Sequence, residues 1–186
     1  MKFGVVVFPG SNCDYDCQHV LSEVLGQETE MLWHENRDLK ECDCIILPGG
    51  FSYGDYLRTG AIARFSPVME SIRNFIEGGG LVIGICNGFQ ILLKTNLLAA
   101  GDQHGATLTN NDSGRFEARW VRLAIEPGKC VFLQGIREME LPVAHGEGKF
   151  ATGGASVFEE MGAAGRLVAR YAGGSGAGTP RLAWTR

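Results

Sequence analysis

A single cysteine stands where a run of strand-like residues gives way to a run of helix-like residues. This cysteine is Cys86, with Gly84 two residues before it and Gly88 two residues after it. Small residues at these positions let a strand turn sharply into a helix, as in a nucleophile elbow. The partial positive charge of the helix N-terminus would favour the thiolate, which is the reactive form of cysteine. A buried structural cysteine is the alternative, and the paired glycines favour a nucleophile.

A cysteine nucleophile also needs hydrogen-bond donors for the oxyanion that forms after attack. Asn87 follows the cysteine, so its backbone N–H is expected at the elbow. A second N–H is expected from the Gly49-Gly50-Phe51 turn, because glycine there lets the backbone approach a ligand closely. A plain turn would explain Pro48-Gly49-Gly50 alone, but the aromatic segment that continues to Tyr56 is too long for a simple connection.

The proton acceptor is harder to identify, since the chain contains only four histidines. His145 is followed two residues later by a carboxylate, Glu147. A histidine with a nearby carboxylate is the pair that a cysteine triad uses. A glycine-rich turn with a structural histidine and glutamate explains the same segment equally well, so the residues alone leave both interpretations open.

The elements that must position these residues form a regular series in the first half of the chain. Short apolar runs that are typical of buried strands alternate with helix-like segments; the runs are 3–8, 29–33, 44–47 and 81–85. This alternation predicts βαβ units. The expected fold class is therefore α/β, a three-layer, mostly parallel open sheet with helices on both faces. In such sheets chemistry collects beyond the carboxyl ends of the strands, where residues 10–12, 49–55 and Cys86 can meet.

Two helices of this half have specific expected features. The first is expected to be capped by Ser11 or Asn12 and to bury an apolar stripe made of Cys17, Val20, Leu21, Val24 and Leu25. The second is expected to begin with Ser66 as its N-cap and Pro67 at its first position.

The second half of the chain does not show the regular alternation of strands and helices predicted for the first half. Strands are predicted over 119–125, 139–143 and 167–171, and a helix over 157–161. The segment 172–186 opens with a glycine-rich stretch that cannot pack a core, which predicts a flexible tail. The expected organisation is one domain over 1–171 followed by that tail.

Composition limits the function classes. The net charge is −4 with no basic cluster, which argues against a nucleic-acid partner. No charge-free run approaches membrane-spanning length, and the N-terminus runs directly into a strand, so neither a membrane segment nor a signal peptide is expected. Six irregularly spaced cysteines predict reduced thiols in the cytoplasm, and their spacings are not those of a zinc site, so no metal is expected.

Longer motifs add a resemblance to a known family. The chain resembles the class I (triad-type) glutamine amidotransferases, whose fold is flavodoxin-like, and within them the glutaminase subunits of phosphoribosylformylglycinamidine synthase. The motifs that carry the resemblance extend in order over residues 1–171; they are segments 7–14, 47–58, 60–69, 84–92, 111–121 and 143–148.

The resemblance implies a reaction and a set of roles. The reaction is the hydrolysis of L-glutamine to glutamate and ammonia, in which Cys86 forms a γ-glutamyl thioester. The N–H groups of Gly50 and Asn87 would hold the oxyanion. Gln90 would help to bind the glutamine substrate, and Phe116 falls where the family closes the substrate pocket.

The resemblance also implies partners. Ammonia would pass to a PurL-type synthetase subunit, which uses ATP and Mg²⁺ to aminate formylglycinamide ribonucleotide in purine biosynthesis. A PurS-type small subunit would complete the assembly. No cofactor is expected in this chain.

One departure from the family pattern affects the expected activity. The family's catalytic histidine and glutamate lie in a Pro-His-Pro-Glu segment that is missing here, and the motifs end near Tyr171. His145 and Glu147 belong to a different family motif and are not favoured as triad members. Feeble glutamine hydrolysis is therefore predicted. A non-catalytic subunit that binds a synthetase, and a ThiJ/PfpI-type hydrolase or chaperone, are the alternative functions.

Overall fold

The computed structural model describes residues 1–98, 106–126, 128, 130–172 and 181–183. The chain forms two compact units, Met1–Leu97 and Leu98–Arg186. The sequence instead suggests one domain over 1–171. The strand pairing changes at the same boundary, from parallel in the first unit to antiparallel in the second.

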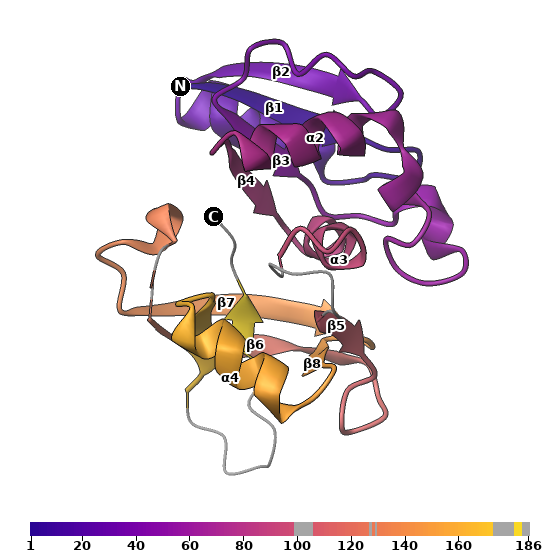
Figure 1. Ribbon diagram of the computed structural model, residues 1–186. Helices are drawn as coiled ribbons and strands as arrows, with labels where there is room; N and C mark the ends of the chain where they lie inside the picture. Colours follow the sequence, from indigo (N-terminus) through magenta and orange to yellow (C-terminus); the bar gives the residue numbers. More distant parts are fainter. Residues whose placement is uncertain (99–105, 127, 129, 173–180, 184–186) are drawn as a thin grey trace. The chain divides into compact units, whose positions relative to one another are not determined.

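The first unit is built on a four-stranded parallel sheet (Figure 1). Its strands are β1 (Lys2–Val7), β2 (Glu28–Trp33), β3 (Cys44–Leu47) and β4 (Leu81–Gly84), in the order β2-β1-β3-β4. The central strand β3 is buried at every residue, as its continuous apolar sequence requires. The predicted parallel sheet is therefore confirmed.

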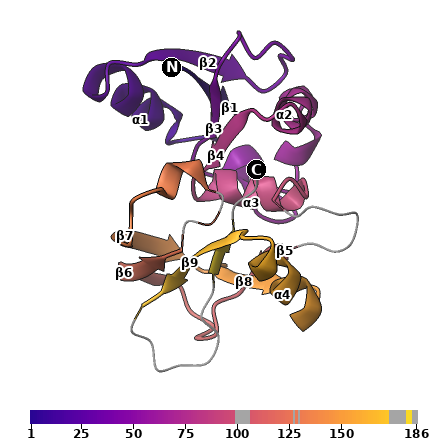
Figure 2. The same ribbon diagram turned by 60° about the vertical axis from the view of Figure 1, so that its left-hand side comes forward.

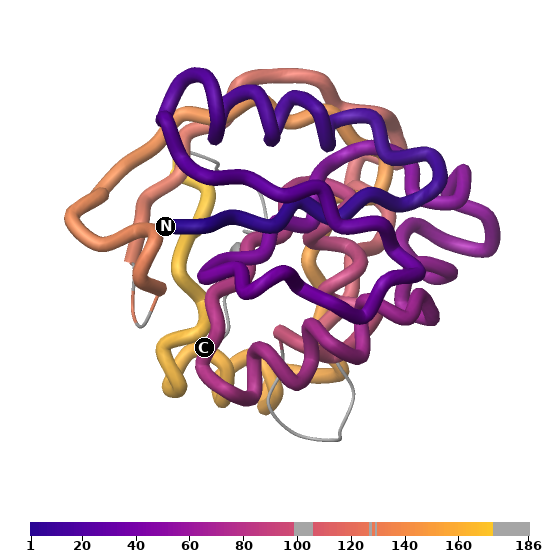
Figure 3. The backbone as a smooth tube through the Cα atoms, turned by 90° about the horizontal axis from the view of Figure 1, so that it is seen from above, coloured from indigo at the N-terminus to yellow at the C-terminus, as the bar shows by residue number. Residues whose placement is uncertain are grey.

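Residues 34–43, between β2 and β3, contain no helix, but helical segments follow β1, β3 and β4. The helical segments are α1 (Asp14–His19) with its π-helical continuation η1 (Val20–Val24), the short 3₁₀ turns η2 (Ser52–Asp55) and η3 (Ala63–Phe65), α2 (Pro67–Glu77), and α3 (Asn87–Lys94). Figure 2 shows α1 and α2 on opposite faces of the sheet. The alternation of strand and helix can be followed from the N-terminus along the tube in Figure 3. The predicted three-layer α/β arrangement is confirmed in this unit.

The predicted apolar stripe of the first helix is wrong in part. Leu21 is buried and packs beside Val5, but Val20, Val24 and Leu25 are exposed. The reason is the π-helical turn, in which the N–H of Leu25 donates to the carbonyl of Val20 at 2.9 Å. A wider turn rotates the following residues off the face that a 3.6-residue spacing defines.

The predicted capping of this helix is also wrong. Cys13 occupies the N-cap position, and no side chain caps the first turn. The Ser11 hydroxyl instead accepts a hydrogen bond from the N–H of Phe8 at 3.2 Å. Ser11 is therefore used to close the turn that follows β1.

The start of α2 agrees with the prediction in position but not in detail. Ser66 is the N-cap and Pro67 the first helical residue, and Val68, Met69 and Ile72 are buried. No side-chain capping bond forms, however, because the Ser66 hydroxyl is hydrogen-bonded to the Tyr53 hydroxyl at 2.9 Å.

The second unit contains an antiparallel sheet with the strand order β10-β9-β6-β7. These strands are β6 (Glu117–Ile125), β7 (Glu138–His145), β9 (Leu167–Tyr171) and β10 (Arg181–Ala183). A separate antiparallel pair joins β5 (Ala106–Thr109) to β8 (Lys149–Thr152). Helix α4 (Ala155–Ala163) follows β8 in the chain, and the 3₁₀ turn η4 (Val131–Leu133) lies between β6 and β7. Val121, Leu123, Ile125 and Ala169 form a buried cluster.

Most of this unit follows the predicted pattern. The strands predicted over 119–125, 139–143 and 167–171 and the helix at 157–161 are present, whereas β5 and β8 were not predicted. Strand β10 lies inside the segment 172–186, and residues 173–180 and 184–186 are outside the described part. Within the described residues, no helix combines the length and apolar character needed to cross a bilayer.

Candidate catalytic site

Cys86 lies in the bend between β4 and α3. It is the N-cap of α3 and has a φ of 51° and a ψ of −106°. A positive φ is costly for a residue with a β carbon, by about 1–3 kcal/mol, so the surrounding structure must impose it. Two hydrogen bonds do so, from the N–H of Gly88 to the carbonyl of Ile85 at 2.9 Å and from Gln90 to Cys86 at 3.2 Å. The side chain is exposed at the start of the helix.

The two glycines allow β4 and α3 to approach this closely. A β carbon on Gly84 would lie 2.8 Å from the carbonyl carbon of Gly88, and one on Gly88 would lie 1.9 Å from the carbonyl oxygen of Leu47. Real β carbons are not found at such distances from backbone atoms. The glycine spacing that predicts an elbow therefore corresponds to contacts that only glycine permits.

Both expected oxyanion donors have unused N–H groups. Among the described residues, neither the N–H of Gly50 nor that of Asn87 donates to another protein group. A β carbon on Gly49, the residue before Gly50, would lie 3.5 Å from the Cys86 β carbon, so this turn packs against the cysteine. Gly50 itself has a φ of +130° and pairs with Ser11 across an isolated bridge. The role of the Gly50 and Asn87 N–H groups as oxyanion donors stays a prediction.

The expected substrate-binding residues are divided between the two units. Gln90 lies one turn along α3 from Cys86 and accepts a hydrogen bond from the Asn87 side chain at 2.9 Å. Phe116 precedes β6 in the second unit and is 68% exposed. The structure therefore groups Gly50, Asn87 and Gln90 with Cys86 in one unit, whereas Phe116 belongs to the other.

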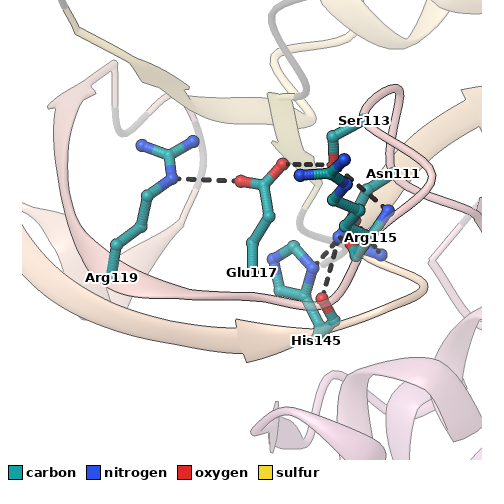
Figure 4. Close-up of polar contacts among 7 residues, drawn as sticks. Asn111, Ser113, Arg115, Glu117, Arg119 and His145 are labelled. Carbon is teal, nitrogen blue, oxygen red and sulfur yellow. Dashed lines mark hydrogen bonds and ion pairs between the residues drawn. The ribbon is translucent and has the colours of Figure 1, made fainter.

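His145 also belongs to the second unit, where it is held by Asn111 (Figure 4). Asn111 Nδ2 donates to the carbonyls of Arg115 and His145, each at 2.8 Å, so the amide oxygen faces the histidine ring. His145 Nδ1 donates to that oxygen at 2.9 Å, which leaves Nε2 as the acceptor nitrogen of the neutral ring.

A carboxylate other than Glu147 faces His145 across the sheet. Glu117 is the register partner of His145 in the β6–β7 pair. Glu117 accepts hydrogen bonds from Ser113 at 2.9 Å and from Arg119 at 3.0 Å, which are drawn as dashed lines in Figure 4. These hydrogen bonds lower the pKa of Glu117. The sequence gives no signal for this pairing, since it depends on strand register. A triad role for His145 and Glu147 stays a hypothesis.

The comparisons with known proteins agree with this geometry. A family model described as a CobB/CobQ-like glutamine amidotransferase domain matches residues 1–184. The chain belongs to this family. The match covers the elbow of the amidotransferase and extends past Tyr171, near which the motifs of the resemblance end.

Two relatives of this amidotransferase share the same name. Phosphoribosylformylglycinamidine synthase subunit PurQ of Koribacter versatilis is 47% identical over 92% of the chain and 73% of its own length. The protein of the same name from Moorella thermoacetica is 45% identical over 97% of the chain and 75% of its length. The chain thus spans about three quarters of the length of these relatives.

Solved structures agree with the sequence relatives. The structure of PurLQS from Thermotoga maritima is 38% identical with a TM-score of 0.75, over 93% of this chain and 75% of that one. A glutamine amidotransferase from the same organism is 17% identical with a TM-score of 0.52, over 81% and 62% of the two chains. The second likeness shows the fold alone.

The other cysteines of the amidotransferase differ from Cys86 in their surroundings. Burial raises the pKa of Cys44 to about 12, and burial is also the main cause of the raised pKa of Cys13 and Cys42. A thiol with a raised pKa is a poor nucleophile near neutral pH. Within the described part of the chain, no cluster of three or more His, Cys, Asp or Glu residues could hold a metal ion.

The loop that carries Gly50 is anchored by a buried histidine. The Tyr53 hydroxyl is hydrogen-bonded to Nδ1 of His34 at 2.9 Å, and the His34 ring stacks on Phe8 with the centroids 6.2 Å apart. Burial lowers the pKa of His34 below its ordinary value of 6.5. This anchor could not be predicted from the sequence, because His34 and Tyr53 are far apart in the chain and belong to no common motif.

The lowered pKa predicts acid sensitivity of the fold. Above an unfolded-state pKa of about 6.5, His34 is neutral in both states and costs nothing. As the pH falls below that value, the unfolded chain gains the proton before the folded protein does, so the free energy of unfolding decreases. We expect the drop in Tm between about pH 7.5 and about pH 5 to be smaller in His34→Gln than in the wild type, as measured by circular dichroism. Equal drops would contradict the prediction.

Proposed function

We propose that this chain is the glutaminase subunit of a phosphoribosylformylglycinamidine synthase and hydrolyses L-glutamine to glutamate and ammonia. The observation that carries the proposal is the exposed Cys86 at the N-terminus of α3, with the turn at Gly49 packed against it and with unused N–H groups on Gly50 and Asn87. The PurQ relatives, at 45–47% identity over most of the chain, support the same function.

The proposed chemistry follows from the elbow. The Cys86 sulfur, as the thiolate, attacks the carboxamide carbon of glutamine. The N–H groups of Gly50 and Asn87 stabilise the oxyanion of the tetrahedral intermediate. The leaving amide nitrogen takes up a proton from water as the carbon–nitrogen bond breaks, so that ammonia is released and a γ-glutamyl thioester remains. Water then hydrolyses the thioester to glutamate and restores the thiol.

The proposed partners follow from the relatives. A PurL-type synthetase receives the ammonia and uses ATP and Mg²⁺ to aminate formylglycinamide ribonucleotide, with a PurS-type subunit completing the complex. The PurLQS assembly of Thermotoga maritima supports this arrangement. The amidotransferase itself needs no cofactor for thioester chemistry. All six cysteines are free thiols, which suits the cytoplasm as the place of action.

A chloroketone analogue of glutamine tests the proposal. The expected result is stoichiometric alkylation of Cys86, slowed by glutamine but not by asparagine, as measured by intact mass and peptide mapping. A ThiJ/PfpI-type protein would show no protection by glutamine. In a non-catalytic binding subunit, the chloroketone would alkylate Cys86 no faster than iodoacetamide does. Either outcome would overturn the proposal. Glutamate release in the presence of the synthetase separately tests the predicted feeble turnover.

A further inference from the structure

The side chain of Asn87 is buried beside the nucleophile and is fully committed to hydrogen bonds. It is 2% exposed, although it stands at the first position of α3 directly after Cys86. Its Oδ1 accepts from the N–H of Ser52 at 3.1 Å. Its Nδ2 donates to Asp55 Oδ1 at 3.1 Å and to Gln90 Oε1 at 2.9 Å. Both amide protons are therefore used.

The partners of Asn87 fix which way its amide points. The N–H of Ser52 can only donate, so it must face the oxygen of Asn87. The ionised carboxylate of Asp55 can only accept, so it must face the nitrogen. The orientation is therefore determined by the chemistry of both neighbours, and an inverted amide would lose both bonds.

This orientation in turn sets the orientation of Gln90. Because Asn87 presents a donor, Gln90 turns its Oε1 toward Asn87. The Nε2 group of Gln90 is then directed away from Asn87, so Gln90 offers donors to a ligand at the helix. A carboxylate or carbonyl oxygen of the substrate would be the matching group.

The same side chain restrains a loop whose backbone is strained. Tyr53, Asp55 and Leu57 have positive φ angles of 54°, 53° and 70°. Each such residue costs about 1–3 kcal/mol, so the loop persists only where other contacts hold it. Ser52 and Asp55, which bind Asn87, lie on either side of Tyr53 and shortly after Gly50. Asn87 thereby ties the segment that follows the Gly50 N–H to the helix that carries Cys86.

We propose that the Asn87 side chain is a positioning residue with two effects: it sets Gln90 as a donor toward the substrate, and it holds the Gly50 loop against the nucleophile. This inference rests on the proposed glutaminase function. It adds a side-chain role to the backbone role expected of Asn87. Glutamine recognition and oxyanion stabilisation then depend on one buried amide.

The test is the kinetics of alkylation by the chloroketone analogue of glutamine, measured on the full chain. The half-saturating concentration reports recognition by Gln90, and the maximal rate reports oxyanion stabilisation. Asn87→Asp keeps the shape and the acceptor for Ser52 but removes both donors and places a carboxylate against Asp55. We expect a roughly 10²–10³-fold loss in the ratio of maximal rate to half-saturating concentration, with both constants affected.

Two further variants separate the effects. In Asn87→Asp/Asp55→Asn, the new amide can donate to residue 87, so the maximal rate should recover by about tenfold or more while recognition stays weak. Gln90→Glu still accepts from Asn87 but cannot donate to the substrate. The half-saturating concentration should therefore rise about tenfold or more, with the maximal rate changed less than about threefold. The second variant needs no change in the loop, so it tests the donor assignment even if Asn87→Asp fails to fold.

The controls distinguish failure of this inference from failure of the proposed function. If the wild type is not protected by glutamine, the proposed function is wrong. If the wild type is protected and Asn87→Asp reacts with the same two constants, the positioning role is wrong. Loss of chloroketone alkylation together with increased labelling of the buried Cys42 and Cys44 by iodoacetamide, which needs no pocket, would indicate a merely unfolded variant. In that case an unchanged half-saturating concentration in Gln90→Glu would overturn the inference.

Discussion

Replacement of Cys86 by alanine is expected to abolish alkylation by the chloroketone analogue of glutamine and to reduce the predicted feeble glutamate release to the uncatalysed background. The thiolate supplies the electron pair that forms the thioester, and no other described thiol has its position at the N-terminus of a helix that follows a glycine elbow. Oxyanion donors and binding groups alone leave only a small residual rate. The measurement is glutamate release in the presence of the synthetase, together with chloroketone alkylation followed by peptide mapping.

The matched control for this variant is Cys17→Ala. Cys17 is a half-buried thiol of α1 whose pKa is raised mainly by burial. Its removal should leave both the rate and the alkylation within about threefold of the wild type, since only an apolar contact is lost. Alkylation that persists in Cys86→Ala and maps to Cys13, which also lies next to Gly49, would show that the nucleophile is misassigned.

The elbow could be predicted from sequence because its signal is local. Gly84, Cys86 and Gly88 are close in the chain, and each glycine corresponds to a backbone contact that a β carbon would break. Strand β3 could likewise be placed to the residue, because four consecutive buried apolar residues leave few alternatives. Local steric constraints and continuous burial are thus the features that sequence reports well.

The features that could not be predicted depend on contacts that the spacing of apolar residues along the chain does not reveal. The exposure of Val20 and Val24 follows from a π-helical turn, which the helical spacing of apolar residues does not reveal. The role of the Asn87 side chain depends on a loop more than thirty residues earlier in the chain, at Ser52 and Asp55. From the sequence, only the backbone N–H of Asn87 could be assigned a role, because the partners of its side chain lie in that distant loop.

The site residues taken from the family resemblance show the same division. Gln90 and Asn87 could be placed near Cys86, since they share one helix. His145 could be identified only as a candidate proton acceptor beside Glu147, and its contacts with Asn111 and Glu117 emerged only from the turn and the strand register. Motif spacing identifies residues that are neighbours within one helix or strand. Contacts between residues of different elements can be identified only once the fold is known.

Replacement of Gly88 by alanine should destabilise the first unit by at least about 3 kcal/mol, at the upper end of the effect of overpacking. A β carbon there would lie 1.9 Å from the carbonyl oxygen of Leu47 and 2.8 Å from its β carbon. Since the oxygen belongs to the backbone of the central strand β3, it cannot move aside as a flexible side chain would. The clash must be relieved by separating α3 from β3. For a chain of this size, the expected decrease in Tm is about 6–12 °C.

The same separation should impair the chemistry even in molecules that stay folded, because Cys86 and Asn87 begin the displaced helix. Gly78→Ala is the matched control: its φ is −75°, and the added β carbon would be 3.4 Å from the carbonyl oxygen of Asn74, an ordinary contact. That variant should keep its Tm and its chloroketone alkylation rate. If Gly88→Ala melts within about 1 °C of Gly78→Ala and is alkylated as fast, the close approach of α3 to β3 does not constrain the nucleophile, because a shift of that size corresponds to less than about 0.5 kcal/mol.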